Sequence, residues 1–306
     1  MEHIGKVTMN YDYYSGKDLY SDGDIEDTLL EIVKNHDKSE FPEIIAEKKS
    51  WPVLYHLSDV RTNILNWYPF KKDANVLEVG AGCGAITGTL ADKTARVTAV
   101  DLSKRRSLIN AYRNNDKENL EIIVGNFYDI SSAMKERYDY VTLIGVLEYG
   151  ECYIPGENAY QAFLEKIKGL LKPDGKVLIA IENQLGLKYF AGCKEDHVGR
   201  YFEGIEGYTN TSGVRTFSKK ALADLLTQSG YEGLEFYYPY PDYKLPDTIY
   251  TDDFLPAKGE LCRNSRNFDA DRMVLFNETK AWDTIIEAGL FPEFSNSFFV
   301  VATKKG

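Results

Sequence analysis

The sequence predicts a doubly wound α/β fold with a mostly parallel, seven-stranded sheet whose last strand is antiparallel. From residue 74 onward, short apolar runs alternate with segments of helical apolar spacing, as in a parallel sheet covered by helices. The apolar runs 233–238 and 297–303 complete the seven strands and form a terminal hairpin. The first apolar run breaks into a glycine-rich turn, and the second ends in an acid, Asp101. These patterns fix the expected fold class.

The region before the sheet is expected to form an arm and a helical cap over residues 1–70, followed by the main domain over 71–306. Residues 1–24 are rich in Tyr, Asp and Gly, which predicts an irregular arm. Apolar residues at helical spacing predict helices over 25–36 and 52–67.

The alternating elements of the main domain follow one another closely. They are expected as strand 75–79, helix 84–92, strand 96–100, helix 104–114, strand 120–124, a short helix near 130–136, strand 139–144, helix 158–171 and strand 176–182. Residues 172–175 predict a turn, since Pro fixes φ and Gly relieves it. A helix from Ser218 to Gly230 and one near 279–288 follow. Two stretches without this rhythm, about 184–216 and 239–296, are expected to be insertions.

Composition argues against several functional classes. The chain has 306 residues, 43% of them hydrophobic and 27% charged, which is ordinary for a globular protein. A net charge of −11 argues against broad binding to nucleic acid or to anionic membranes. No apolar run approaches the roughly 20 residues that span a bilayer. The first twelve residues are polar, which predicts no signal peptide.

The four cysteines are scattered, with no spacing typical of zinc ligands. We therefore expect reduced thiols, a cytoplasmic location and no bound metal.

The glycine-rich turn spans Val76 to Ala85 together with the strand before it. Glycines permit a sharp turn and let a ligand lie against bare backbone, and the following helix presents free N–H groups at its start. Asp101 stands nineteen residues past Gly82, at the tip of the next strand. An acid there can accept both hydroxyls of a ribose, so a nucleoside-containing cofactor is predicted.

Two kinds of cofactor fit this turn, a dinucleotide and S-adenosylmethionine. Gly80, Gly82 and Ala85 also satisfy the fingerprint of dinucleotide-binding dehydrogenases. Glu78 on the strand, the loop 145–149 after the fourth strand and the terminal hairpin instead resemble features typical of class I methyltransferases, which use S-adenosylmethionine.

The sequence resembles the class I S-adenosylmethionine-dependent methyltransferases over about residues 50–240 and the last strand. The matching segments are Leu77–Gly84, Val100–Ser103, Gly125–Phe127, Gly145–Tyr149 and Leu171–Val177. More narrowly, stretches 51–58, 182–189 and 238–246 resemble bacterial methyltransferases encoded beside glycosyltransferases of surface-polysaccharide pathways. The resemblance implies a Rossmann-like fold and S-adenosylmethionine as cofactor, with S-adenosylhomocysteine as product.

The resemblance also implies cofactor contacts. They are the backbone of Gly80, Ala81 and Gly82, Glu78 for the amino group, Asp101 for the ribose, Leu102, Asn126 and Phe127 for the adenine, Gly145 and Val146 after the fourth strand, and Arg61 for the methionine carboxylate. The family often has Asp in place of Asn126, but Asn keeps an acceptor and adds a donor. Two alternatives stay open, namely that Asp101 caps a helix and that Arg61 lies on a solvated face. Cys83 is expected to be a small spacer in the turn.

Catalysis is expected to need alignment and a base for the acceptor's proton. Glu148, Glu182 and Asn183 follow the fourth and fifth strands, and His197 stands in the next irregular stretch. We assign catalysis to His197 and Glu148, with a neutral imidazole at His197 taking the proton. A surface histidine and a pocket-shaping glutamate are the open alternatives.

Three further segments carry open alternatives. The tyrosines of 237–243 either line a saccharide groove or pack around the sixth strand. Arg215 either holds an anionic group of the acceptor or only stands at a helix start. Residues 104–106, Lys-Arg-Arg, are expected to be a solvated face.

The expected activity is methylation of a hydroxyl on a small molecule or saccharide. N-methylation of a small amine stays open, and so does a non-catalytic cofactor-binding module that partners a glycosyltransferase. No nucleic acid or membrane span is expected, and the oligomeric state is left open.

Overall fold

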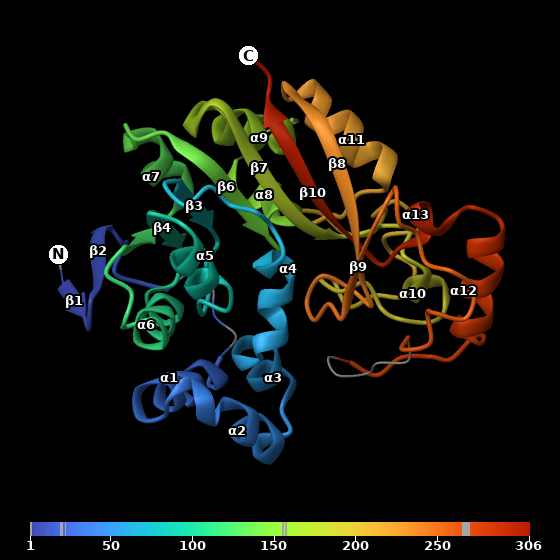
Figure 1. Cartoon of the computed structure of the whole chain (residues 1–306), viewed down its shortest axis with the longest axis horizontal. Coiled ribbons are helices and arrows are strands. Elements are labelled where there is room, and N and C mark those ends of the chain that lie inside the picture. The colour runs from blue at the N-terminus through green and yellow to red at the C-terminus, as the bar shows by residue number, and fades with distance from the viewer. Residues whose placement is uncertain (1, 19–20, 22, 155, 157, 265–269) are drawn as a thin grey trace. The chain divides into compact units, whose positions relative to one another are not determined.

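The computed structural model describes residues 2–18, 21, 23–154, 156, 158–264 and 270–306 (Figure 1). Residues 19, 20 and 22 of the expected arm and 265–269 of the expected insertion lie outside this part. The chain forms two compact units. The first comprises residues 1–143, 166–177 and 306, and the second comprises 144–165 and 178–305.

Within the described residues the sheet is mixed and has ten strands, in the order β1-β2-β5-β4-β3-β6-β7-β10-β8-β9. The seven expected strands are β3 (Asn75–Val79), β4 (Arg96–Asp101), β5 (Leu120–Gly125), β6 (Tyr138–Ile144), β7 (Leu171–Glu182), β8 (Tyr231–Tyr240) and β10 (Ser297–Lys304). The other three are β1 (Glu2–Ile4), β2 (Val7–Tyr13) and β9 (Thr248–Thr251). The expected count of seven was therefore too low.

The expected irregular arm instead forms a hairpin of β1 and β2. The two strands pair antiparallel, and β2 then pairs parallel with β5. Val7 and Met9 are fully buried while their neighbours are partly exposed. This period-two alternation is the mark of a strand, and it was obscured by the many polar residues around it.

The centre of the first unit is a parallel array. β4 pairs with β5 and with β3, and β3 pairs with β6, in each case in parallel. In chain order, β4 and β5 are added on one side of β3, and β6 is then added on the other side of β3. The switch point therefore lies between β3 and β6. Ligands of doubly wound sheets bind at the carboxyl ends of the strands beside such a switch.

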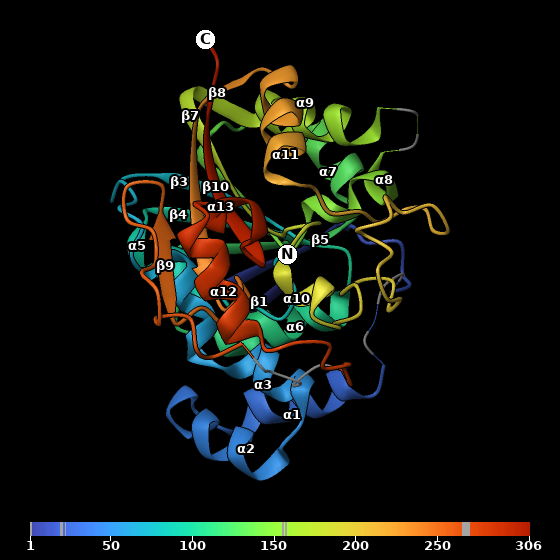
Figure 2. The ribbon, with the colours of Figure 1, turned by 90° about the vertical axis from the view of Figure 1, so that its right-hand side faces the viewer.

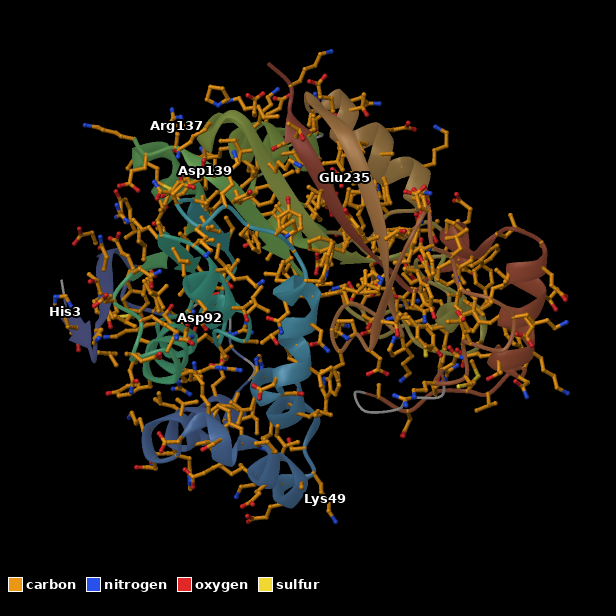
Figure 3. All side chains as sticks on the ribbon, in the orientation of Figure 1. His3, Lys49, Asp92, Arg137, Asp139 and Glu235 are labelled. Atoms are coloured by element: carbon orange, nitrogen blue, oxygen red, sulfur yellow. The ribbon has the colours of Figure 1, made fainter. Side chains whose placement is uncertain are left out.

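Asp139, labelled in Figure 3, connects the starts of these strands. Its Oδ2 accepts the backbone N–H of Asn75 at 2.8 Å and a hydrogen bond from Lys172 Nζ at 2.7 Å. The start of β3 is thereby held beside that of β6.

The helical cap is composed of short elements. They are α1 (Ile25–Asn35), η1 (Lys38–Glu40), α2 (Phe41–Lys48), α3 (Trp51–Leu57), η2 (Asp59–Thr62) and α4 (Asn63–Asn66). The single helix expected over 52–67 is wrong, because Ser58 adopts an extended conformation and its hydroxyl accepts from the N–H of Val60. Figure 2 shows α1, α2 and α3 grouped together.

The cap shares its core with the glycine-rich turn. Leu29, Phe41 and Val53 pack in one buried cluster with Cys83 of the turn and Ile109. Cys83 is therefore a buried packing residue, as expected. The turn that is expected to bind a ligand rests on apolar contacts with the cap.

The remaining helices of the first unit are α5 (Thr87–Lys93), α6 (Lys104–Arg113) and α7 (Phe127–Ala133). α6 packs on β4 and β5, and α5 packs on β4. α7 begins earlier than the expected residue 130, because the side chain of Asn126 accepts from the N–H of Tyr128 and caps the helix.

The second unit carries most of the expected insertions. Its further elements are η3 (Leu147–Tyr149), α8 (Gly150–Tyr153), α10 (Leu187–Phe190), α11 (Lys219–Gln228), α12 (Glu278–Glu287) and α13 (Phe291–Phe294). α9 (Ala159–Leu170) and β7 have residues in both units. β10 pairs antiparallel with β8, as expected for the terminal hairpin, and β8 pairs antiparallel with β9.

The expected turn over 172–175 lies within the bounds of β7. Asp174 has a φ of 59°, which marks the bend that Pro and Gly predicted. None of the helices in the described part of the chain is both long and apolar enough to cross a membrane.

Candidate active site

The glycine-rich turn follows β3 along a left-handed path. Gly80, Gly82 and Gly84 have φ angles of 69°, 53° and 74°, a region that residues with a Cβ rarely adopt. The N–H of Gly80 donates to the carbonyl oxygen of Val100 at 2.8 Å, which ties the turn to the end of β4. A Cβ at Gly84 would lie 2.2 Å from Oδ1 of Asn110, so this position has no room for a side chain.

Asp101 holds the turn from the tip of β4. Its Oδ2 accepts the N–H of Gly82 at 2.7 Å, and its Oδ1 accepts the N–H of Ser103 at 2.9 Å. The role of helix cap belongs instead to Ser103, whose hydroxyl oxygen accepts from the N–H of Arg106. Each carboxylate oxygen retains a second lone pair, so Asp101 is still able to accept ribose hydroxyls. Leu102, next to it, is half-buried.

Glu78 on β3 is a buried carboxylate that lacks compensation. Its side chain is 2% exposed, and within the described residues neither carboxylate oxygen accepts a hydrogen bond of normal geometry. Burial raises the pKa of Glu78 to about 8, although the nearby Thr87 hydroxyl opposes that rise. Burying a carboxyl group in this way is costly unless a partner is present. A cationic ammonium group is a fitting partner.

Asn126 and Phe127 connect β5 to α7. The Oδ1 of Asn126 accepts the N–H of Tyr128 at 2.9 Å, and this carbonyl oxygen can accept a second hydrogen bond. Phe127 is 2% exposed and belongs to the core. Asn126 is half-buried, so its amide stays accessible at the end of the strand.

Arg61 in the cap is buried rather than solvated. It is 7% exposed, and its guanidinium carbon lies 4.0 Å from the ring centre of Tyr55. Such stacking fixes the guanidinium plane. The alternative of a solvated face at Arg61 is therefore wrong.

The expected solvated face over 104–106 is wrong for Arg106. Its side chain is 15% exposed, and its Nε lies 3.9 Å from Oε1 of the fully buried Glu26. A Cβ at Gly82 would lie 3.3 Å from the Arg106 guanidinium. Arg106 therefore lies against the glycine-rich turn.

In the second unit, Gly145 and Val146 begin the loop after β6. Gly145 has a φ of 70°, and a Cβ there would lie 2.8 Å from the hydroxyl of Tyr243. Its N–H donates to the carbonyl oxygen of Ala180 at 2.9 Å. Val146 is 3% exposed and packs in the core. Glycine at 145 thus permits close approach of Tyr243.

His197 is enclosed by three glutamates of the second unit. Its Nε2 lies 3.3 Å from Oε1 of Glu148 and 3.7 Å from Oε2 of Glu182, and its Nδ1 lies 3.1 Å from Oε1 of Glu195. The imidazole is 7% exposed, and the Tyr149 ring meets it edge-on. His197 is therefore not a surface-loop histidine. The structure brings it together with Glu148, the other residue to which we assign catalysis.

The charges around His197 determine its protonation. Burial disfavours the imidazolium, but the negative charges of Glu182, Glu148 and Glu195 prevail and raise the pKa of His197 to about 11. At neutral pH the ring then carries two protons, so the expected neutral imidazole is wrong. Burial raises the pKa of Glu148, and the His197 hydrogen bond opposes that rise.

An ion-pair network that we did not predict adjoins this group. Lys244 Nζ lies 2.7 Å from Oε1 of Glu182 and 2.5 Å from Oδ1 of Asp196. Lys188 Nζ lies 2.8 Å from Oδ2 of Asp196. Burial alone would raise the pKa of Asp196, but Lys188 and Lys244 hold it well below its usual range. Sequence patterns did not indicate this network, because Lys244 lies 48 residues beyond Asp196 along the chain.

Asn183 has a structural role. Its side-chain amide donates to the carbonyl oxygens of Glu293 and Ser295 at 2.8 and 2.7 Å, and its Oδ1 accepts the N–H of Leu185. Asn183 is fully buried. Its amide therefore secures the end of β7 to the segment before β10.

Two segments for which alternatives were open have contacts within the second unit. Tyr238, Tyr240 and Tyr243 are 0%, 6% and 2% exposed, which favours core packing over a saccharide groove. Arg215 donates through its backbone N–H to the carbonyl oxygen of Glu148, and its guanidinium to that of Gly207.

The expected site residues fall into two groups. The first unit holds Arg61, Glu78, Gly80, Ala81, Gly82, Asp101, Leu102, Asn126 and Phe127, and the second holds Gly145, Val146, Glu148 and His197. Glu195, Lys188 and Lys244 are neighbours of His197 or its partners that sequence reasoning did not single out.

Comparison with known proteins identifies relatives of one kind. A family model described as "Methyltransferase domain" matches residues 53–235. An uncharacterized methyltransferase of Staphylococcus carnosus is 29% identical over 155 residues, which cover 51% of this chain and 67% of the relative. A ubiquinone biosynthesis O-methyltransferase of Coxiella burnetii is 28% identical over 160 residues, 49% of this chain and 64% of the relative. The chain thus spans about two thirds of the length of these curated relatives.

Among solved structures, the chain is similar to the N-methyltransferase NodS from Bradyrhizobium japonicum WM9 in complex with S-adenosylhomocysteine. The TM-score is 0.47 at 12% sequence identity, and the match covers 92% of this chain and 98% of that one.

Proposed function

The chain belongs to the methyltransferase domain family, and we propose that the group it methylates is a hydroxyl of a small molecule or saccharide. The chain is a methyltransferase that uses S-adenosylmethionine. The single observation that carries the proposal about the acceptor is a buried glutamate, Glu148, with one oxygen left for a proton.

The residues of the first unit fit the methyl donor. The unpaired carboxylate of Glu78 suits the ammonium group of the methionine half, and Asp101 suits the ribose hydroxyls. Arg61 suits the carboxylate, Leu102, Asn126 and Phe127 the adenine, and the backbone at Gly80, Ala81 and Gly82 permits close approach. When bound, S-adenosylmethionine supplies an activated methyl group with a good leaving group. The protein is left to align the acceptor and remove its proton.

Glu148 is the group that we assign to the acceptor's proton. Its Oε1 lies 3.3 Å from His197 Nε2, while its Oε2 is buried with no hydrogen-bond partner among the described residues. Because burial raises the pKa of Glu148, its carboxylate is a stronger base than an exposed one. The imidazolium of His197 orients this carboxylate rather than taking the proton itself.

A hydroxyl acceptor is favoured over an amine because a hydroxyl oxygen needs a base at the moment of transfer. The Coxiella burnetii relative carries an O-methyltransferase name, which supports the same choice. N-methylation of a small amine and a non-catalytic module beside a glycosyltransferase are outcomes that the experiment below distinguishes. A cytoplasmic location remains a prediction that rests on the four free cysteines.

The test has two stages. Calorimetry with S-adenosylmethionine and S-adenosylhomocysteine measures donor binding, and transfer of a labelled methyl group to panels of sugars, phenols and amines measures activity. Glu148→Gln should retain donor binding but lose methylation of a hydroxyl by about 10²-fold or more. Donor binding without transfer to any panel member would favour the non-catalytic module. Activity on amines alone would overturn the hydroxyl acceptor.

A further inference from the structure

We propose that Glu148, Glu182 and His197 form a binding site for a divalent transition-metal ion. The scattered cysteines led us to expect no metal, but the candidate ligands here are oxygens and a nitrogen. They come from three places along the chain, η3, the end of β7 and the loop after α10. The sequence pattern therefore did not indicate such a site.

The candidate ligand atoms already have suitable spacing. One atom from each of the three side chains lies within 4.8 Å of the other two. The Nε2 of His197 is 3.3 Å from Oε1 of Glu148 and 3.7 Å from Oε2 of Glu182. Ligands bound at about 2.1 Å to one ion lie roughly 3.0–3.5 Å from one another. Small side-chain shifts are enough to bind an ion.

The orientation of His197 resembles that of a metal ligand. Its Nδ1 faces Oε1 of Glu195 at 3.1 Å, while the other oxygen of Glu195 accepts the N–H groups of His197 and Val198, each at 2.7 Å. The hydroxyl of Tyr208 donates to the same Oε1 at 3.0 Å. A carboxylate on the far nitrogen of a ligating histidine fixes its tautomer and ring orientation. Nε2 is thereby directed at the two other carboxylates.

Both glutamates have an oxygen that the protein leaves unsatisfied. Glu148 and Glu182 are 1% and 0% exposed, and the Oε2 of each has no hydrogen-bond partner among the described residues. Lys244 pairs with Oε1 of Glu182, so this oxygen is compensated while Oε2 faces His197. Buried carboxylate oxygens without a hydrogen bond are costly. A divalent cation would compensate both at once.

The donor set indicates the class of metal. One imidazole with two carboxylates suits Mn²⁺, Fe²⁺, Co²⁺ or Zn²⁺ better than Ca²⁺ or Mg²⁺, which prefer oxygen ligands alone. Three protein ligands leave positions open for water or an acceptor, as in catalytic sites. A role in polarising the acceptor's hydroxyl rests on the proposed function, but the existence of the site does not.

Metal binding must displace the proton on Nε2 of His197, so that the ion replaces the imidazolium as the group that orients Glu148. The proton is released to solvent, so the affinity for the ion should rise with pH. The groups that face this ring are Glu148, Glu182 and Glu195, and Lys188, Lys244 and Asp196 adjoin them through Glu182. These lysines keep their charge over the useful pH range, because the pKa of each is raised by Asp196 despite burial.

The experiment uses the full chain after treatment with a chelator. Mn²⁺ is titrated by electron paramagnetic resonance, Co²⁺ by visible absorption and Zn²⁺ by calorimetry. We expect one ion per chain and, for Mn²⁺, a nitrogen coupling from one imidazole in pulsed spectra. Glu148→Gln and Glu182→Gln remove a ligand and should weaken binding more than about 100-fold. Glu195→Gln should weaken it about 10- to 100-fold, as outer-shell changes do.

Glu203→Gln is the matched control. Glu203 is buried in the same unit, and its carboxylate accepts from the N–H of Asn210 rather than facing His197. The control should bind the ion as the unmodified protein does. Absence of one-to-one binding for Mn²⁺, Co²⁺ and Zn²⁺ alike would overturn the site, and so would equal weakening in Glu203→Gln and Glu148→Gln.

Folding and donor binding keep the outcomes separate. If a variant fails to fold by circular dichroism, the nitrogen coupling in the unmodified protein still decides, and its absence refutes ligation by His197. Calorimetry with S-adenosylmethionine on the metal-free protein tests the methyl donor independently. Ion binding without donor binding would leave the metal site standing and remove the proposed function. Donor binding without ion binding would remove the metal site and leave the proposed function standing.

Discussion

The Nδ1 atom of His197 lies 3.1 Å from Oε1 of Glu195, two residues earlier in the same loop. The other carboxylate oxygen accepts the backbone N–H of His197 itself, at 2.7 Å. A single glutamate therefore fixes both the loop and the ring that it carries. The opposite edge of the ring is consequently turned toward Glu148 and Glu182.

This arrangement predicts the protonation of His197 in the chelator-treated protein. With a pKa raised to about 11, both ring nitrogens should stay protonated at pH 8. Because the pKa is raised on folding, the resulting stabilisation is complete below about pH 6.5, the ordinary value, and is lost as the pH rises toward 11. Nitrogen-15 shifts of the imidazole provide the measurement. A neutral ring at pH 8 would restore the neutral-base role expected from sequence.

Replacement of Glu78 by Gln should weaken binding of S-adenosylmethionine. The amide keeps the size of the side chain but removes the charge opposite an ammonium group, which is worth about 1.5–3 kcal/mol, or roughly 10- to 150-fold. Calorimetry measures the change. Asp129→Asn, an exposed charge in the first helical turn of α7, is the control and should bind normally. Equal affinities in both variants would remove Glu78 from the donor site.

The pKa of Glu78 predicts a pH dependence of donor binding. Since burial raises this pKa to about 8, most of the free protein has a neutral Glu78 at pH 7. A cationic ligand favours the carboxylate, so binding should release a proton and the affinity should rise between pH 6 and 8. Calorimetry in buffers of different ionisation enthalpy counts the protons. Proton uptake instead of release would contradict this assignment.

Alanine at position 84 should destabilise the protein more than alanine at position 16. Gly84 and Gly16 both have a left-handed φ, of 74° and 84°. A Cβ at Gly84 would lie 2.2 Å from Asn110 Oδ1, whereas one at Gly16 would have no atom within 4 Å. We expect about 1 kcal/mol for the backbone term at Gly16 and 1–3 kcal/mol more at Gly84 from overpacking. Urea unfolding of both variants measures the difference, and equal losses would show that Asn110 can yield.

Asn183→Ala should destabilise the second unit without removing any charge. The change leaves the carbonyl oxygens of Glu293 and Ser295 and the N–H of Leu185 without their partner. Each unsatisfied buried group costs about 1–3 kcal/mol, so a loss of several kcal/mol in the free energy of unfolding is expected. Asn35→Ala, on the exposed end of α1, should change stability by less than about 0.5 kcal/mol. A similar loss in both variants would contradict the structural role of Asn183.

Much of the fold was readable from local patterns. The seven expected strands, β3 to β8 and β10, lie within two residues of their expected bounds except at the start of β7, because period-two and period-3.6 apolar spacing are local properties. The prediction of an irregular arm was wrong, since two buried residues, Val7 and Met9, give too short an apolar pattern among polar neighbours. The prediction of one continuous helix over 52–67 was wrong, because Ser58 leaves the helical conformation in the middle of an apolar stripe.

The sequence by itself determined the methyltransferase fold and its cofactor turn, because Glu78, the glycines and Asp101 occupy fixed places along adjacent strands. The tertiary structure alone decided the charge of His197 and its surroundings. Glu148 and Glu182 approach the ring from two other elements, η3 and β7, while Glu195 approaches it from the same loop. Lys244 pairs with Glu182 from still farther along the chain. Coulomb interactions depend on distance in space and on burial rather than on sequence spacing. For that reason a histidine expected to be a neutral base lies instead among carboxylates that favour its protonated form in the metal-free protein.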